Sequence, residues 1–231
     1  MSEIETNQSA AAARFSPFER AVSLLELLAG IAIVVAHNVF KAVPNEVPIL
    51  AALALLSFWL RDRGFRAIGW TRPKSWPLTL LWAIAAAAVV ILLGELVTDP
   101  LTTAMWGKPP DTSSFSALTG NWRDAGMMLL LVWSFAAVGE EFGYRGYLLT
   151  RAADLGGRST AAYVASLVLV SIVFGIGHYY QGPSGILSTA CDGFVMGAAY
   201  LLSGRNFWVP ILTHGLVDTF GIVVLFFGLA S

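Results

Sequence analysis

The sequence predicts an all-α membrane protein, a polytopic bundle of about seven transmembrane helices with an expected range of six to eight. Of the 231 residues, 56% are hydrophobic and only 13% are charged, and the mean hydropathy is +0.68. A soluble domain carries about 25% charged residues. The apolar residues also gather in runs long enough to cross the bilayer. Together these observations indicate an integral, multi-pass membrane protein, and the net charge of −1 gives no sign of nucleic-acid binding.

Seven apolar segments account for the predicted spans. They cover residues 21–40, 47–60, 78–97, 124–150, 160–178, 185–202 and 207–229. A span needs about 17–25 residues, so the second segment is near the lower limit. The longest connection, residues 98–123, is rich in Pro, Gly, Ser and Thr and is expected to be a loop.

The first twenty residues are polar and lack the basic start and the cleavage site of a signal peptide. We expect residues 1–20 to form a disordered cytoplasmic tail. No repeat or second domain is visible, so residues 21–231 are predicted to form a single membrane domain.

Basic residues are distributed unevenly over the connections of this seven-span arrangement. One side carries Arg14, Arg20, Arg61, Arg63, Arg66, Arg72, Lys74, Arg151, Arg158 and Arg205. The other side carries only Lys41, Lys108 and Arg123. Because short cytoplasmic connections are enriched in Lys and Arg, we expect a cytoplasmic N-terminus and an external C-terminus.

The fourth segment contains three ionisable residues in apolar surroundings, Glu140, Glu141 and Arg145. A charged side chain at the centre of a membrane helix costs on the order of 2.5–3.5 kcal/mol, so a partner or a function is expected. Glu141 and Arg145 share a helix face and can form an ion pair. Glu140 points about 100° away without an equivalent partner, as expected of a general base. The structural alternative is a charge cluster that only locks helix packing.

Two later segments supply histidines. A hairpin of the fourth and fifth segments, turning near residues 156–157, would bring His178 to the depth of Glu140. In the last segment His214 and Asp218 are four residues apart, so both can point at one spot. Read alone, His178 could be an interfacial group and the His–Asp pair a local contact.

Other polar residues in the spans receive no catalytic role: Glu26, His37, Asn38, Glu95 and Asp192. Most are expected to lie at the membrane interface, whereas Asp192 could line the same cavity or bond only to a neighbour. Gly193 and Gly197 form a small-xxx-small pair, which predicts close packing of two helices.

Three motifs occur in order, each in its own segment: Glu-Glu-x-x-x-Arg at 140–145, Phe-x-x-x-His at 174–178 and His-x-x-x-Asp at 214–218. This arrangement resembles the CPBP family of intramembrane endopeptidases, which includes the eukaryotic CAAX prenyl protease and many prokaryotic Abi-type proteins. The Gly-Phe-Val-Met-Gly stretch at 193–197 is also similar to the family. The resemblance covers residues 124–231, the expected catalytic core.

The resemblance implies a catalytic cavity inside a helical membrane bundle, where a glutamate and a histidine activate a water for attack on a peptide carbonyl. By matched position, Glu140 would be the general base and His178 its partner on the water. His214 would help to stabilise the oxyanion. Glu141 and Arg145 would hold the first glutamate in place.

One position departs from the family pattern. The third motif often ends in Asn, which can donate a hydrogen bond to an oxyanion, whereas an ionised Asp218 cannot. Asp218 could be protonated, could orient His214, or could mark a member that is not a peptidase. We favour the second interpretation, in which Asp218 fixes His214 as the donor.

No cofactor is expected, although Glu140, His178 and His214 could form a three-ligand zinc site. The HExxH spacing of zinc peptidases is absent, and Cys191 is the only cysteine, so no thiolate cluster can bind metal. The resemblance favours the metal-free glutamate mechanism.

The predicted function is therefore an intramembrane endopeptidase that acts on a peptide or membrane-protein substrate in the bilayer, in a prokaryotic plasma membrane. The alternative is a non-catalytic membrane protein of the same fold, acting in self-immunity to peptides or as a scaffold. A proton-coupled transporter is less favoured because no inverted repeat is visible. The oligomeric state stays open.

Overall fold

The computed structural model describes residues 15–229, which form helices and connections without a β-strand among them. The α-helices are α2 (Pro17–Asn38), α3 (Glu46–Ser57), α4 (Trp76–Leu93), α5 (Asp99–Trp106), α6 (Trp122–Leu131), α7 (Leu149–Leu155), α8 (Thr160–Gly177), α9 (Gly182–Leu202) and α10 (Trp208–Phe226). Some are extended by π-helical segments, at Phe58–Asp62, Gly94–Thr98, Val132–Glu140 and Phe142–Leu148. Short 3-10 turns lie at Phe65–Ile68, Ser113–Leu118 and Tyr179–Gln181. The predicted all-α class is confirmed.

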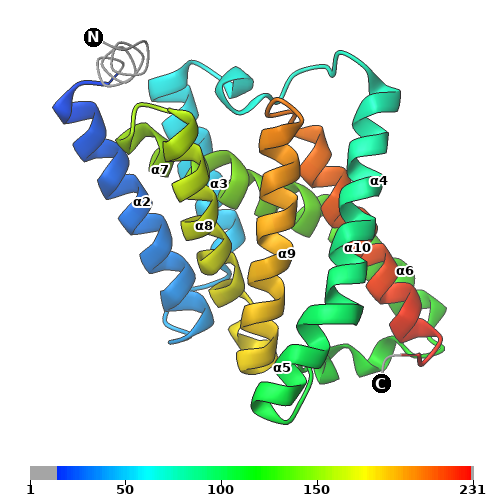
Figure 1. Cartoon of the computed structure of the whole chain (residues 1–231). Helices are drawn as coiled ribbons and strands as arrows, with labels where there is room; N and C mark the ends of the chain where they lie inside the picture. The colour runs from blue at the N-terminus through cyan, green and yellow to red at the C-terminus, as the bar shows by residue number, and fades with distance from the viewer. Residues whose placement is uncertain (1–14, 230–231) are drawn as a thin grey trace.

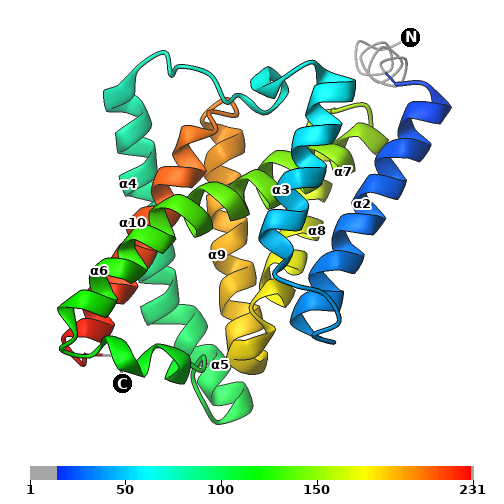
Figure 2. The same ribbon diagram turned by 180° about the vertical axis from the view of Figure 1, so that it is seen from behind.

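Within residues 15–229, six helices are long and apolar enough to cross a membrane. They are Pro17–Asn38, Trp76–Trp106, Trp122–Leu155, Thr160–Gly177, Tyr179–Leu202 and Trp208–Phe226. The predicted second span is instead the 12-residue helix α3, whose length of about 18 Å is well below a bilayer core of about 30 Å. Nevertheless α3 leads the chain back toward the end of the bundle where α2 begins (Figures 1 and 2). As a result, α2 begins at one end of the bundle and α10 finishes at the other.

Helix α2 begins earlier than predicted because of a local capping signal. The side chain of Ser16 accepts a hydrogen bond from the Glu19 backbone, and the Glu19 carboxylate accepts one from the Ser16 backbone. This capping box, with Pro17 in the first turn, starts the helix inside the stretch 1–20 expected to be disordered. Residues 1–14 of that stretch lie outside the described part of the chain. Side-chain N-caps also open four later helices, at Asn45, Ser75, Asn121 and Ser159.

The expected loop 98–123 contains a helix, so that prediction is wrong in part. Helix α5 follows α4 after the π-helical segment Gly94–Thr98. It is terminated by Gly107, which has a positive φ of 75°. The Asp-Pro pair that opens α5 is typical of turns, but proline is also well suited to the first turn of a helix. Here the helical alternative is adopted.

The connections that carry most of the basic residues lie together. The α3–α4, α7–α8 and α9–α10 connections all lie at the end of the bundle where α2 begins (Figure 1). The α2–α3 connection and α5 lie at the opposite end (Figures 1 and 2). The connections that carry most of the described basic residues are therefore at opposite ends, as predicted, whereas Arg14 lies outside the described residues. The cytoplasmic location of the N-terminus stays a prediction.

Helices α8 and α9 pack closely, as the small-residue pair predicted. A Cβ atom at Gly193 would lie 2.9 Å from the Phe174 ring, and one at Gly197 would collide with Leu167. Both partners lie on α8. The missing side chains on α9 therefore permit an approach that a larger residue would prevent.

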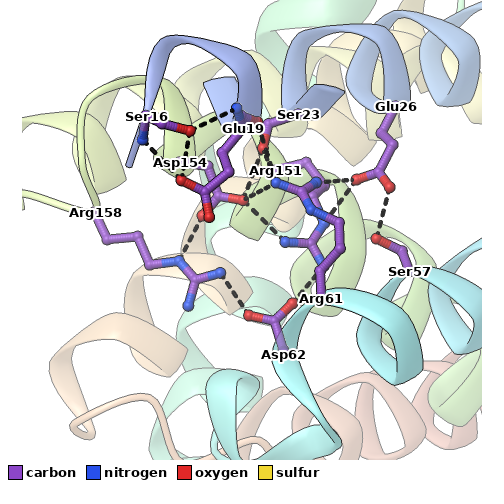
Figure 3. Close-up of polar contacts among 10 residues, drawn as sticks. All are labelled: Ser16, Glu19, Ser23, Glu26, Ser57, Arg61, Asp62, Arg151, Asp154 and Arg158. Carbon is purple, nitrogen blue, oxygen red and sulfur yellow. Dashed lines mark hydrogen bonds and ion pairs between the residues drawn. The ribbon is translucent and has the colours of Figure 1, made fainter. Parts of the chain in front are cut away.

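A network of charges ties α2, the end of α3 and α7 together near the α7–α8 turn (Figure 3). Its members are Glu26, Arg61, Asp62, Arg151, Asp154 and Arg158. Glu26, expected at the membrane surface, instead accepts hydrogen bonds from Ser57 and Arg61. Burial raises the pKa of Asp62, but the neighbouring guanidinium groups of Arg151 and Arg158 outweigh it, so the pKa lies below its usual range. This network holds three helices at the same end of the bundle.

Candidate active site

The fourth predicted span is one continuous helical stretch, Trp122–Leu155, as expected. Its centre, however, is π-helical on both sides of Glu141, at Val132–Glu140 and Phe142–Leu148. Turns of π-helix are rare and frequently occur at functional sites. The acidic pair therefore lies at the junction of two unusual segments, a feature that hydrophobic periodicity did not reveal.

Glu141 is fully buried and bonded to two motif residues. Its Oε1 accepts a hydrogen bond from Nη1 of Arg145 at 2.8 Å and another from Nδ1 of His214 at 2.8 Å. The predicted ion pair with Arg145 is confirmed, and both side chains are almost inaccessible, at 0% and 2% exposure. Glu141 thus joins the fourth span to α10.

Arg145 is held from three sides. Besides Glu141, its Nη2 donates to the carbonyl oxygen of Gly193 at 3.1 Å, and its guanidinium carbon lies 4.1 Å from the centre of the Phe174 ring. The absence of a Cβ at Gly193 makes this contact possible, since such an atom would lie 3.1 Å from Nη2. Arg145 therefore contacts α8 and α9, and Glu141 contacts α10. Neither side chain bonds the carboxylate of Glu140.

His214 lies between two carboxylates. Its Nδ1 faces Glu141, and its Nε2 lies 3.4 Å from Oδ2 of Asp218, which is 31% exposed. The second distance is longer than a well-formed hydrogen bond. His214 is therefore firmly oriented through Nδ1, while Nε2 is only weakly engaged on the more accessible side.

Glu140 differs from its neighbour in having no hydrogen bond or ion pair to another described residue. It is half-buried, and the nearby charges that act on it are those of His214, Asp218, Glu141 and Glu46. One acid of the pair is thus paired and inaccessible, whereas the other is unpaired and partly accessible. This is the contrast expected from the sequence.

His178 terminates α8 and is also half-buried. Its Nδ1 lies 3.1 Å from the carbonyl oxygen of Phe174, which can only accept, so Nδ1 carries the hydrogen. In the neutral ring Nε2 is then an acceptor. His178 shares His214, Asp218 and Glu46 as charged neighbours with Glu140, although no direct bond joins Glu140 to His178 among the described residues.

Phe174 lies at the centre of the three motifs. Its ring contacts the rings of Tyr144, His178 and His214, with centroids 5.0, 5.0 and 6.1 Å away. The sequence motif included Phe174 without assigning it a role. Packing against several aromatic neighbours restricts the orientation of each ring, so Phe174 is a candidate positioning residue.

The N-terminal half contributes a polar cluster that the sequence analysis missed. Glu46, at the start of α3, is buried and accepts hydrogen bonds from Asn38 at 3.0 Å and from the Tyr144 hydroxyl at 3.4 Å. His37 lies 3.4 Å from its second oxygen. His37 and Asn38, expected at the interface, therefore belong to the surroundings of the site. No helical spacing connects residues so far apart in the chain, so only the tertiary structure identifies Glu46.

Asp192, for which the sequence left two roles open, is half-buried, and the charges of Asp99, Asp218, His214 and Arg145 act on it. Across residues 15–229, no three His, Cys, Asp or Glu side chains form a group that could hold a metal ion. The three-ligand zinc set considered from the sequence is therefore not gathered in this structure.

Comparisons with known proteins agree with the motif resemblance. The family model described as type II CAAX prenyl endopeptidase Rce1-like matches residues 122–220. No curated protein and no solved structure gives a match. The matched range contains all six candidate site residues and excludes the Glu46 cluster. Over these residues the chain is therefore similar to type II CAAX prenyl endopeptidases.

Proposed function

We propose that this protein is an intramembrane endopeptidase that hydrolyses a peptide bond with a water activated by Glu140 and His178. The observation that supports it best is the contrast within the acidic pair. Glu141 is buried and bonded to Arg145 and His214, whereas Glu140 is unpaired and half-buried. A general base has to be within reach of its water and free to take a proton.

The proposed step begins when Glu140 removes one proton from the water, while Nε2 of His178 accepts a hydrogen bond from the other O–H group of the water. The water oxygen attacks the carbonyl carbon, and the electron pair of the C=O bond moves to the oxygen. Collapse of this intermediate breaks the C–N bond, and Glu140 returns its proton to the leaving amine. One water is consumed and the side chains return to their initial state.

The oxyanion would be stabilised by Nε2–H of His214. This ring donates through Nδ1 to Glu141, and it can also donate through Nε2 only when both nitrogens carry hydrogen. The Nε2 contact with Asp218 at 3.4 Å is long enough for a developing oxyanion to compete for that hydrogen. Asp218 then acts as a positioning residue for the imidazolium, and it need not donate a hydrogen bond itself.

The mechanism uses no metal, and this part of the proposal needs its own measurement. The purified protein is incubated with a chelator, freed of it by gel filtration and assayed in metal-depleted buffer. Full activity is expected. Loss of activity that returns when zinc is added would overturn the metal-free mechanism.

The substrate is a peptide segment that enters the bilayer, and the family suggests a prenylated CAAX terminus as the first candidate. Two substrates separate the possibilities: a fluorogenic peptide with a prenylated CAAX end, and an unprenylated transmembrane peptide of matched length. Cleavage of the first alone assigns a prenyl-protein substrate. Cleavage of both assigns a broader membrane peptidase.

The central experiment compares Glu140→Gln and His178→Ala with the parent chain in reconstituted vesicles. Both changes are expected to abolish cleavage, because each removes a group that contacts the water. Glu95→Gln is the matched control, since Glu95 is an exposed acid in another membrane helix. Circular dichroism and gel filtration establish that the variants are folded. Normal cleavage by both site variants would refute the proposal and favour a non-catalytic scaffold or immunity protein.

A further inference from the structure

A second polar site lies where the α3–α4 and α9–α10 connections meet. A cleft of about 270 Å³ is enclosed by the α3–α4 connection, the first turn of α4 and the α9–α10 connection. Its polar lining includes Arg72, Lys74, Ser75, Arg205 and Asn206. It shares no lining residue with the candidate active site, so its function is a separate question.

The cleft is strongly cationic. Three of its lining residues are basic, and no acidic residue is among the described residues that line it. Arg72 and Lys74 are exposed and bond no other described residue. Arg205 uses Nη1 to donate to the Tyr163 hydroxyl at 2.6 Å, while its Nε and Nη2 bond no described partner. The site therefore offers several unused donors to an anion.

The walls of the cleft are held in place by the fold. Asn206 donates to Thr79 of α4 at 2.8 Å, and the backbone N–H of Phe207 donates to the Gly69 carbonyl oxygen at 3.4 Å. Arg205 has a positive φ of 61°, which a non-glycine residue adopts only when its surroundings require it. The basic side chains thus come from connections that are fastened together, and little ordering is needed when an anion binds.

The surroundings of the cleft are those of a membrane interface. The Trp76 and Trp208 rings pack with centroids 5.5 Å apart, and Trp76 is exposed at the start of α4. Tryptophan is enriched at the headgroup level of membranes. Directly below on the same helix, Leu78 and Leu81 are 54% and 63% exposed. An anionic group in the cleft could therefore continue into acyl chains lying along α4.

We propose that this cleft binds the phosphate of an anionic phospholipid, with Arg72, Lys74 and Arg205 on the headgroup and α4 beside the acyl chains. Basic pockets between membrane helices recognise such headgroups through charge and hydrogen bonds. The lipid would anchor the α3–α4 connection to α9 and α10. This inference does not depend on the proposed peptidase activity.

The experiment measures lipid binding to the full-length protein in neutral detergent by native mass spectrometry. Phosphatidylglycerol is titrated against phosphatidylcholine of the same acyl chains. Arg72→Gln and Lys74→Gln should each weaken phosphatidylglycerol binding about fivefold, the equivalent of about 1 kcal/mol per basic residue. Arg66→Gln is the matched control, because Arg66 is an exposed residue of the same connection outside the cleft. It should leave binding unchanged.

Two results would overturn the inference. The first is equal loss of binding in Arg66→Gln and in the cleft variants, which would indicate only a diffuse surface charge. The second is displacement of phosphatidylglycerol by millimolar inorganic phosphate, which would assign the cleft to a soluble phosphate compound. Arg72 and Lys74 make no bonds within the described residues, so loss of folding is not expected to obscure the result.

Discussion

Replacing Arg145 by Met tests the buried charge network most directly. Met keeps an unbranched side chain of similar length but removes the charge and all hydrogen-bond donors. The change breaks the 2.8 Å ion pair with Glu141 and the 3.1 Å bond to the Gly193 carbonyl. It also removes the contact of the guanidinium with the Phe174 ring.

The ion pair should dominate the loss of stability. Glu141 is fully inaccessible, its Oε2 has no hydrogen-bond partner among the described residues, and without Arg145 its only remaining partner is His214. Leaving a buried charge uncompensated costs about 3–5 kcal/mol. A single interhelical hydrogen bond in a membrane protein contributes only about 0.6 kcal/mol. We therefore expect Arg145→Met to lower the free energy of unfolding by about 3–5 kcal/mol.

The assay is reversible unfolding in mixed micelles with increasing SDS, followed by the fluorescence of the eight tryptophans. The double variant Arg145→Met with Glu141→Gln should be more stable than Arg145→Met alone, because it no longer buries a carboxylate that has lost its guanidinium partner. Arg123→Met, an exposed arginine at the start of α6, is the control and should change stability by less than about 0.5 kcal/mol. A loss below about 1 kcal/mol in Arg145→Met, or no recovery in the double variant, would contradict a buried ion pair that matters for folding.

Three further variants test other parts of the structure. Asp62→Asn should lower the free energy of unfolding at neutral pH. Because folding lowers the Asp62 pKa, the stabilisation by its carboxylate is complete above the unfolded pKa of about 3.9 and is lost as the pH falls through the lower folded value. The thermal unfolding temperatures of the two proteins should therefore converge at acidic pH, and a difference that does not depend on pH would contradict the ion pairs. Glu46→Ala should destabilise by about 1–3 kcal/mol, since the buried amide of Asn38 loses one of its two acceptors. Glu46→Gln should retain most of the stability in chemical unfolding, and equal effects of the two variants would argue against the bond. Gly193→Val should cost about 1–3 kcal/mol through collision with Phe174, but Gly126→Val, at a glycine with open space around it, should cost less in the same unfolding assay.

Local patterns predicted much of the helical layout. The fifth segment, expected at 160–178, is helix α8 at Thr160–Gly177, and the last, expected at 207–229, is α10 at Trp208–Phe226. Long apolar runs bounded by polar caps leave little choice, because a membrane helix has to satisfy its own backbone. The prediction failed at α3, because an apolar run this short can form either a membrane span or a shorter buried helix.

The i, i+4 pairs of the site were also readable in advance. Glu141–Arg145 and His214–Asp218 each lie on one helix face, and both pairs are in contact in the structure. Their partners on other helices were not readable. The bond from His214 to Glu141 joins positions 73 residues apart, and no period in the sequence encodes that distance.

By itself, the sequence determined the membrane class, the positions of most helices and the three motifs, which all lie within the residues 122–220 that the family model matches. Helix periodicity and the cost of charge in lipid act over a few residues, so a single chain displays them. Only the tertiary structure decided that Glu141 bonds His214, that Glu46 reaches Tyr144, and that basic residues of two distant connections line one cleft. Those outcomes depend on how helices pack against each other, and packing joins side chains whose separation along the chain is arbitrary.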